Sequence, residues 1–190
     1  MIQDRFDHNL SQLLGSSKPK HLAVAVSGGS DSIALLFFIS SWCKRSKTKL
    51  SVLSVNHNLR TESCDEVYYV QNLAKDFGHD FYALFWSAGN NKSALQERAR
   101  EGRYDLMSAK CLELGIPTLL VAHHFDDMLE TYLMRKRKKS GIFGLSSSRS
   151  FFYKGIQLLR PLFNLNKDDL LIYLKKNNIK WLEDSSNQSD

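Results

Sequence analysis

A run of six small polar residues near the start of the chain could bind phosphate. It separates two apolar stretches and consists of Ser27, Gly28, Gly29, Ser30, Asp31 and Ser32. The two glycines allow a positive φ and a close approach of the backbone to a ligand, and the three serine hydroxyls add hydrogen-bond donors. Between a strand and a helix, such a run can hold a polyphosphate on backbone N–H groups. We therefore predict that residues 27–32 bind the phosphates of a nucleotide.

Asp31 differs from the rest of the run, because a carboxylate repels phosphate unless a cation lies between them. Mg²⁺ is commonly held by one or two carboxylates together with substrate phosphates. Asp31 is therefore predicted to contact Mg²⁺ and to be essential for catalysis. A tight turn in which Ser30 or Asp31 caps a helix is the simpler interpretation, but it explains only one or two of the six residues.

Two better-known phosphate-binding patterns do not occur in the sequence. It lacks G-x-x-x-x-G-K-S/T, whose lysine reaches the γ-phosphate, and the G-x-G-x-x-G of dinucleotide-binding folds. Ordinary P-loop phosphoryl transfer and hydride transfer are therefore disfavoured.

The composition is that of a soluble globular protein with a basic surface. Of its 190 residues, 43% are hydrophobic and 24% are charged, and the net charge is +6 with a pI near 9.2. Residues 135–139, RKRKK, concentrate part of this charge. They could contact nucleic acid, although a charge run is also common on a solvated surface.

The sequence gives little support for a membrane protein, a disulfide-bonded protein or a metal-binding protein. The longest apolar run, Ile33–Ile39, is too short to span a bilayer, and the N-terminus lacks a secretory signal profile. We therefore expect a cytoplasmic location and no membrane contact. Cys43, Cys64 and Cys111 form no CxxC pair, which argues against a disulfide framework, a zinc site and an iron–sulfur cluster.

The elements that must position residues 27–32 alternate between strands and helices. Short apolar runs predict strands, and the segments between them have helical length. The predicted strands are 21–26, 49–55, 80–86, 117–124 and a fifth within 154–162. The predicted helices are 2–14, one directly after the polar run, 65–77, 94–114, 126–137 and 166–178, the last capped by Asn166.

This alternation predicts a doubly wound α/β fold with right-handed crossovers. We expect a mainly parallel five-stranded sheet with helices on both faces, in a single domain over residues 1–190. Residues 136–150, basic and then rich in Gly and Ser, are expected to form a mobile loop. In such sheets the ligand lies beyond the carboxyl ends of the strands, where residues 27–32 are placed.

The succession of a strand, SGGSDS and a helix resembles the PP-loop of the N-type ATP pyrophosphatases, which cleave ATP between its α and β phosphates. Further motifs resemble, in order and spacing, the N-terminal domain of the bacterial tRNA(Ile)-lysidine synthase family. They are VNHNLR (55–60) followed by Ser63 and Glu66, ARxxRY (99–104), AHHxDDxxET (122–131), SGxxGL (140–145), RPL (160–162) and WxEDxSN (181–187). The resemblance covers nearly the whole chain.

The resemblance implies an ATP-dependent modification of tRNA. With ATP and Mg²⁺, the family adenylates the C2 oxygen of the wobble cytidine in tRNA(Ile) with a CAU anticodon, and pyrophosphate leaves. The ε-amine of free L-lysine then displaces AMP and gives lysidine. The chain is thus expected to be a ligase that forms a carbon–nitrogen bond. The sequence does not predict the oligomeric state, and a dimer is possible.

The resemblance also suggests roles for pairs of charged residues. Asp127 and Glu130, three apart on a predicted helix, share a face and could hold the ammonium groups of lysine or take a proton from its amine. Alternatively, Asp126 and Asp127 simply cap this helix. Arg100 and Arg103, also three apart, could clamp phosphate or stabilise the adenylated base through charge-assisted hydrogen bonds, although either could be a surface helix residue. Arg103 is expected to act in catalysis and Arg100 to contact the tRNA.

Histidines and the basic run complete the candidate site. His57, His123 and His124 could line the nucleotide pocket, although a lone histidine is more often a packing residue, and none has convincing metal-ligand spacing. The basic run suits contact with the tRNA backbone. Its predicted tRNA-binding residues are Arg135, Arg137, Lys138 and Lys139.

The chain departs from the family pattern in three places. Met128 stands where the family commonly has Gln, residues 138–141 read KKSG instead of RGSG, and the C-terminal tRNA-recognition domains are expected to be absent. Other interpretations stay open. A 2-thiocytidine-type thiolase would need paired cysteines, an amidotransferase-type ligase fits the AHHxDD block poorly, and a truncated chain could bind nucleotide or tRNA without turnover.

Overall fold

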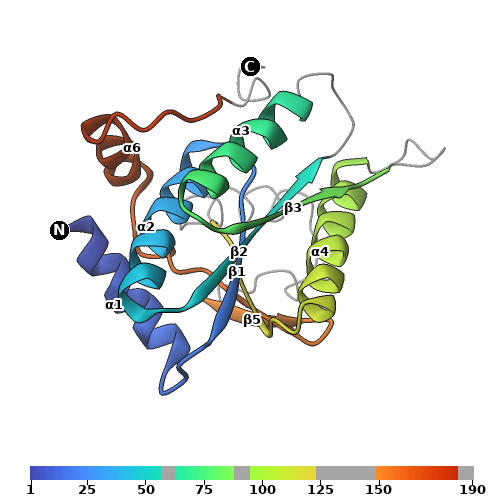
Figure 1. Ribbon diagram of the computed structural model, residues 1–190, viewed down its shortest axis with the longest axis horizontal. Coiled ribbons are helices and arrows are strands. Elements are labelled where there is room, and N and C mark those ends of the chain that lie inside the picture. Colours follow the sequence, from blue (N-terminus) through green and yellow to red (C-terminus); the bar gives the residue numbers. More distant parts are fainter. Residues whose placement is uncertain (57–62, 88–94, 123–148, 184–190) are drawn as a thin grey trace, which may run out of the picture.

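The computed structural model describes residues 1–56, 63–87, 95–122 and 149–183. Within these residues the chain forms a six-stranded sheet in the order β3-β2-β1-β4-β6-β5, with helices on both faces (Figure 1). The strands are β1 (His21–Ala25), β2 (Lys49–Asn56), β3 (Asp80–Phe85), β4 (Thr118–Leu120), β5 (Ser150–Tyr153) and β6 (Ile156–Leu159). The helices are α1 (Ile2–Leu14), α2 (Ser30–Ser46), α3 (Ser63–Asp76), α4 (Leu95–Glu113) and α6 (Lys167–Lys176).

β1 lies at the centre of the sheet and pairs in parallel with β2 on one side and β4 on the other. β3 and β6 extend the two sides in parallel, and β5 is antiparallel to β6. The strand order reverses between β1 and β4, and open α/β sheets bind ligands beyond the carboxyl ends of their strands at such a point. Residues 27–32, called the phosphate loop from here on, follow β1 at this place.

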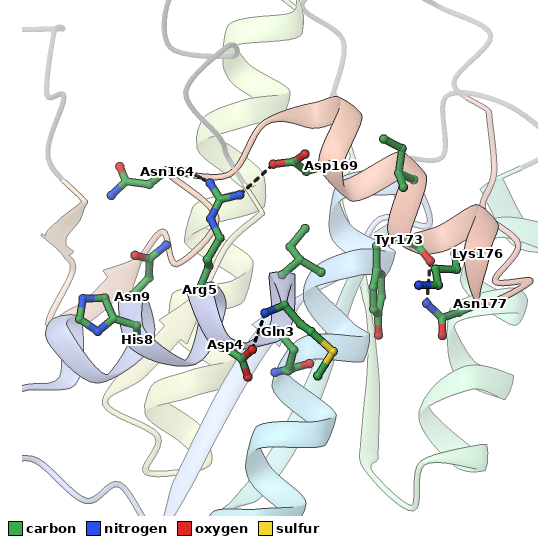
Figure 2. Close-up of a pocket in the computed structure, with 13 residues that line it drawn as sticks. Gln3, Asp4, Arg5, His8, Asn9, Asn164, Asp169, Tyr173, Lys176 and Asn177 are labelled. Atoms are coloured by element: carbon green, nitrogen blue, oxygen red, sulfur yellow. Dashed lines mark hydrogen bonds and ion pairs between the residues drawn. The ribbon is translucent and has the colours of Figure 1, made fainter.

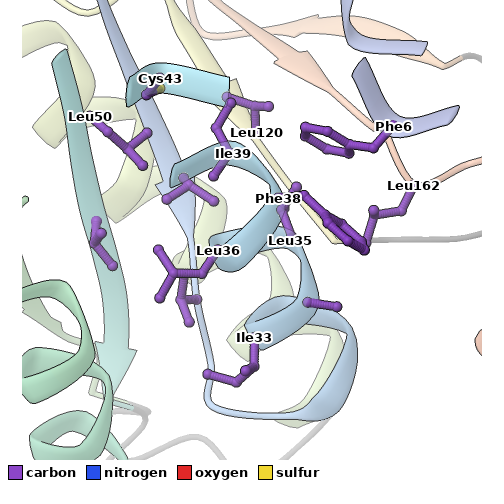
Figure 3. Packing of buried hydrophobic residues seen from close by; sticks show 14 of the residues in the cluster. Phe6, Ile33, Leu35, Leu36, Phe38, Ile39, Cys43, Leu50, Leu120 and Leu162 are labelled. Atoms are coloured by element: carbon purple, nitrogen blue, oxygen red, sulfur yellow. The ribbon is translucent and has the colours of Figure 1, made fainter. Parts of the chain in front are cut away.

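The central strands are apolar on both faces because helices cover both faces. Leu22 and Val24 of β1 point into a core shared with α1, α2, α3 and α6, whereas Ala23 between them belongs to a second core with α4. Figure 3 shows the first core, in which α2 side chains such as Phe38 lie between the sheet and Phe6 of α1. α2 is thus held along its length, which gives the phosphate loop a rigid support.

The doubly wound, mainly parallel fold is confirmed, but the sheet has six strands where five were predicted. The additional strand, β5, reaches β6 through the two residues Lys154 and Gly155, which have φ values of 46° and 84°. Positive φ at both positions is typical of a type I′ hairpin turn. The sequence does not signal this turn, because lysine stands where Asn or Asp is usual.

Most described element boundaries lie within about two residues of the predicted ones, but α2 begins at Ser30, inside the polar run that it was predicted to follow, and β4 is shorter than predicted. β4 spans Thr118–Leu120 instead of 117–124, and Ser150 begins β5 although it was predicted to belong to the preceding loop. Asn166 is the N-cap residue of α6 as predicted, but its side chain makes no capping hydrogen bond to the described chain. The predicted helix 126–137 lies outside the described residues. None of the described helices is long and apolar enough to cross a bilayer.

Candidate functional site

The phosphate loop consists of residues 27–29, which follow β1, and of the first turn of α2. Gly28 is buried and has a φ of +100°, which residues with a Cβ rarely adopt. Gly29, the N-cap residue of α2, has extended backbone, and a Cβ placed on it would meet its nearest neighbour, Ser27 Oγ, at 3.8 Å. The loop conformation therefore requires glycine at 28, whereas the open space at 29 leaves room for a ligand.

Ser32 holds the loop together from inside. Its hydroxyl oxygen accepts hydrogen bonds from the N–H groups of Ser27 and Gly28, both at 3.2 Å, and its hydroxyl donates to the carbonyl of Gly29 at 2.9 Å. The side chain is buried. Sequence analysis grouped Ser32 with the ligand-binding hydroxyls, but within the described structure its contacts lie in the loop itself.

The start of α2 offers N–H groups and one carboxylate. The first N–H groups of a helix have no partner within that helix, and the helix dipole favours an anion there. Asp31 lies in this first turn, half-buried, and accepts a hydrogen bond from Ser30 Oγ at 3.4 Å. Among the described residues no cluster of three or more metal-ligating side chains occurs. A single carboxylate together with phosphate oxygens nevertheless suits Mg²⁺.

Leu182, 154 positions along the chain from Gly28, closes one side of the phosphate loop. Its N–H donates to the carbonyl oxygen of Gly28 at 3.0 Å. A Cβ built on Gly28 would lie 2.7 Å from Leu182 Cδ1, so the leucine side chain occupies the space beside the glycine. Leu182 belongs to the WxEDxSN motif, but the sequence alone suggested no role for it.

Arg100 and Arg103 lie on α4, which packs on the sheet face opposite α2, and they differ in environment. Arg103 is half-buried, and no described residue accepts a hydrogen bond from its buried Nε. This burial lowers the pKa of the guanidinium. Arg100 is exposed, with its guanidinium 5.9 Å from the centre of the Tyr104 ring. No described contact joins either arginine to the phosphate loop.

Trp86 fixes the helix segment next to Arg103. A Cβ placed on Gly102 would lie 1.9 Å from Trp86 Nε1, so only glycine allows the indole to pack this closely on α4. The backbone N–H of Trp86 donates to the carbonyl of Asn56 at 2.9 Å, which ties the carboxyl ends of β2 and β3 together. Gly102 in ARxxRY is therefore a packing residue. This role becomes evident only when the position of Trp86 in the structure is known.

Arg160 is a buried arginine that sequence analysis quoted in the RPL motif without assigning it a role. It follows β6, and its guanidinium lies 4.8 Å from the centre of the Phe151 ring in β5. The backbone N–H of Arg160 donates to the carbonyl of Arg149 at 2.9 Å. A buried cation at the carboxyl end of a strand was not evident from the sequence, because arginine is usually exposed.

The remaining predicted site residues lie outside the described residues, so their assignments stay predictions. They are His57, His123, His124, Asp127, Glu130, Arg135, Arg137, Lys138 and Lys139.

A groove between α1 and α6 lies apart from the predicted site (Figure 2). Arg5 crosses it, donating to Asp169 Oδ2 at 2.9 Å and to the carbonyl of Asn164 at 3.0 Å. None of the predicted site residues lines this groove. These contacts of Arg5 tie α1 to α6 and to the segment before it, which indicates a structural role for the residues of this groove.

Comparison with known families and sequences places these features in context. The chain matches the PP-loop domain family over residues 2–190. It is 51% identical over 189 residues to the tRNA(Ile)-lysidine synthase of Rickettsia bellii (strain OSU 85-389), and 50% identical over 190 residues to that of Rickettsia akari (strain Hartford). Each alignment covers 100% of this chain and 44% of the relative, so the chain spans less than half the length of these proteins.

Two solved structures share this fold. The U34-tRNA thiolase NcsA from Methanococcus maripaludis with its 4Fe–4S cluster aligns with a TM-score of 0.81 at 16% identity, covering 100% of this chain and 67% of that one. The NH3-dependent NAD synthetase from Campylobacter jejuni aligns with a TM-score of 0.63 at 14% identity, covering 94% and 72%. At these identities the likeness shows the fold alone.

Proposed function

Because this chain belongs to the PP-loop domain family, we propose that it binds ATP at residues 27–32 and is the catalytic part of a tRNA(Ile)-lysidine synthase. The observation that carries the proposal is the phosphate loop, built on a glycine of positive φ and an inward-facing serine at the start of α2. The identity of about 50% to enzymes of that name, over the whole chain, supports the choice of reaction.

In the proposed reaction the residues of the loop hold the departing pyrophosphate. The C2 oxygen of the wobble cytidine attacks the α-phosphorus of ATP, and the bond to the β-phosphate breaks. The N–H groups at the start of α2 face the charge that grows on pyrophosphate. Mg²⁺ bound at Asp31 would neutralise part of that charge.

The second half-reaction joins lysine to the base. The ε-amine of lysine attacks C2, and AMP leaves with the C2 oxygen. The deprotonated amine is the nucleophile, so a base must accept its proton, and the carboxylates of Asp127 and Glu130 are proposed for this role. Arg103 is proposed to contact the phosphate of the adenylated base, since its buried Nε has no acceptor among the described residues.

Pyrophosphate release tests this function. The purified chain is mixed with ATP, Mg²⁺ and a tRNA(Ile) transcript with a CAU anticodon, with and without isotopically labelled lysine. We expect release that requires the transcript, and labelled lysine in the tRNA by mass spectrometry. A transcript with a UAU anticodon, which lacks the wobble cytidine, is the matched control. Equal release with both transcripts, or none although ATP binds, would reject the proposal.

A tRNA thiolase is the second candidate, since one solved structure of this fold carries that name. An iron–sulfur cluster needs several cysteines within bonding reach. Cys43 and Cys111 are both buried, in separate cores on opposite faces of the sheet. This placement favours lysine transfer, and dependence of the product on lysine distinguishes the two reactions.

A further inference from the structure

We propose that Leu182 is a positioning residue of the phosphate loop, which it holds in the orientation that binds phosphate. It does so from a strap, defined here as residues 177–183, that follows α6. The proposal rests on the proposed function for the nature of the ligand, a polyphosphate, but not for the tRNA reaction.

The Gly28–Gly29 peptide is the part of the loop that can turn most easily. Neither residue has a Cβ, so little steric resistance opposes rotation of this peptide. In a planar trans peptide, the carbonyl of residue 28 and the N–H of residue 29 point in opposite directions. Whichever group holds the Gly28 carbonyl therefore also sets the direction of the Gly29 N–H.

Leu182 holds that carbonyl. Its N–H donates to Gly28 O at 3.0 Å, so the Gly29 N–H points away from the strap, at the N-cap of α2. In the opposite orientation a carbonyl oxygen would face the bound phosphate and repel it. The leucine side chain adds bulk beside Gly28, where a Cβ would approach Cδ1 to 2.7 Å.

The strap is anchored well enough to serve as a fixed support. Tyr69 of α3 donates its hydroxyl to the carbonyl of Lys180 at 2.6 Å, and the Ile179 N–H donates to the carbonyl of Leu174 at 2.9 Å. Ile179 and Trp181 pack against the core that contains α2. Figure 1 shows this segment running from α6 towards α3. α3, α6 and the phosphate loop are thus joined through one short segment.

Two changes at position 182 separate the backbone contact from the side-chain contact. Leu182→Ala removes the bulk and keeps the N–H. Replacing Leu182 by its α-hydroxy acid keeps the side chain and puts an ester oxygen, which cannot donate, in place of the N–H. Leu182→Met is the conservative control, and Ile172→Ala, at an exposed position of α6, is the control for general effects. Thermal unfolding of each variant reports on the fold.

The probe is inorganic pyrophosphate with Mg²⁺, and its binding is measured by calorimetry. We expect the α-hydroxy acid to weaken binding about tenfold, as when the competent orientation falls to about a tenth of the population. Leu182→Ala should also weaken it, whereas Leu182→Met and Ile172→Ala should bind as the unchanged protein does. Because coupling is reciprocal, pyrophosphate should slow hydrogen exchange in residues 177–183.

The outcomes separate this proposal from the tRNA reaction. Weakened pyrophosphate binding in the two test variants supports the strap even if the protein modifies no tRNA. Unchanged binding in the α-hydroxy acid variant, with no change in exchange, overturns the strap even if lysidine forms. Absence of pyrophosphate and ATP binding in the unchanged protein overturns both proposals.

Discussion

Asp31 and Ser32 are neighbours at the start of α2, but their side chains face different surroundings. Successive residues of a helix are rotated by about 100°. Asp31 is half-buried beside Ser30, whereas Ser32 is buried inside the phosphate loop. Of these two adjacent polar residues, Asp31 can face a ligand, whereas Ser32 shapes the loop.

Asp31→Asn should abolish pyrophosphate release and preserve the fold. The loss of a charge-stabilising group in an active site lowers the rate about 100-fold or more. The measurement is pyrophosphate release with the CAU transcript, together with the unfolding midpoint. Asp168→Asn, an exposed acid in the first turn of α6, is the matched control. Retained release in Asp31→Asn would remove Asp31 from the mechanism.

Ser32→Ala should lower the free energy of unfolding by about 1–3 kcal/mol, because the N–H groups of Ser27 and Gly28 lose an acceptor. It should also weaken pyrophosphate binding, since the loop loses its internal contacts. Chemical denaturation and calorimetry measure the two effects. Ser30→Ala, whose hydroxyl has a contact of 3.4 Å to Asp31, serves as the comparison. Equal effects of the two substitutions would contradict the internal role of Ser32.

At the scale of elements, the alternation of strands and helices could be predicted because parallel strands buried on both faces are continuously apolar. β5 could not, since its turn at Lys154-Gly155 carries no usual hairpin signal. The composition of residues 27–32 predicted an anion site, and the structure places these residues between β1 and the first turn of α2. The contact of Leu182 with Gly28 could not be predicted, because one sequence does not show which distant residues meet when the chain folds.

Gly102→Ala should destabilise the protein, because the new methyl group would overlap the Trp86 indole at 1.9 Å. Overpacking of this kind costs about 1–3 kcal/mol. The higher helix propensity of alanine offsets about 1 kcal/mol of it. Chemical denaturation measures the net change, and Glu101→Ala, at an exposed neighbouring position, is the control. If Gly102→Ala is as stable as Glu101→Ala, the close packing of Trp86 on α4 is wrong.

At the scale of the whole molecule, two half-buried histidines are expected to make stability depend on pH. Burial lowers the pKa of His79 and of His21 below the ordinary value. Ser40 donates its hydroxyl to the carbonyl of Leu36 at 2.6 Å, so its oxygen accepts the Nε2–H of His79 at 2.9 Å. His21 Nε2 lies 2.9 Å from Ser51 Oγ. The folded protein therefore favours neutral imidazoles at both positions.

Stability should fall as the pH drops from about 7.5 to 5. Below the ordinary histidine pKa of about 6.5 the unfolded chain binds protons that the folded chain does not, so protonation favours unfolding. The contribution of these histidines is present above that pH and is lost as the pH falls through their lowered pKa values. Unfolding midpoints measured across this range test the effect.

The matched variants of this prediction are histidine-to-glutamine changes. His79→Gln combined with His21→Gln should flatten the pH dependence relative to His8→Gln, which alters an exposed side chain of α1. A slope that is the same in both proteins would assign the pH dependence to other groups.

The hydrogen bond between Leu182 and Gly28 also has a consequence for synthesis on the ribosome. The phosphate loop leaves the exit tunnel early, when β1 has neither of its strand neighbours, and its contact with Leu182 arrives 154 residues after Gly28. Contacts of such separation form late, since the loop between them must close first. A nascent chain released before residue 182 is made would therefore carry the SGGSDS sequence without the contact that fixes the Gly28 carbonyl, and nucleotide binding would report that this contact has formed.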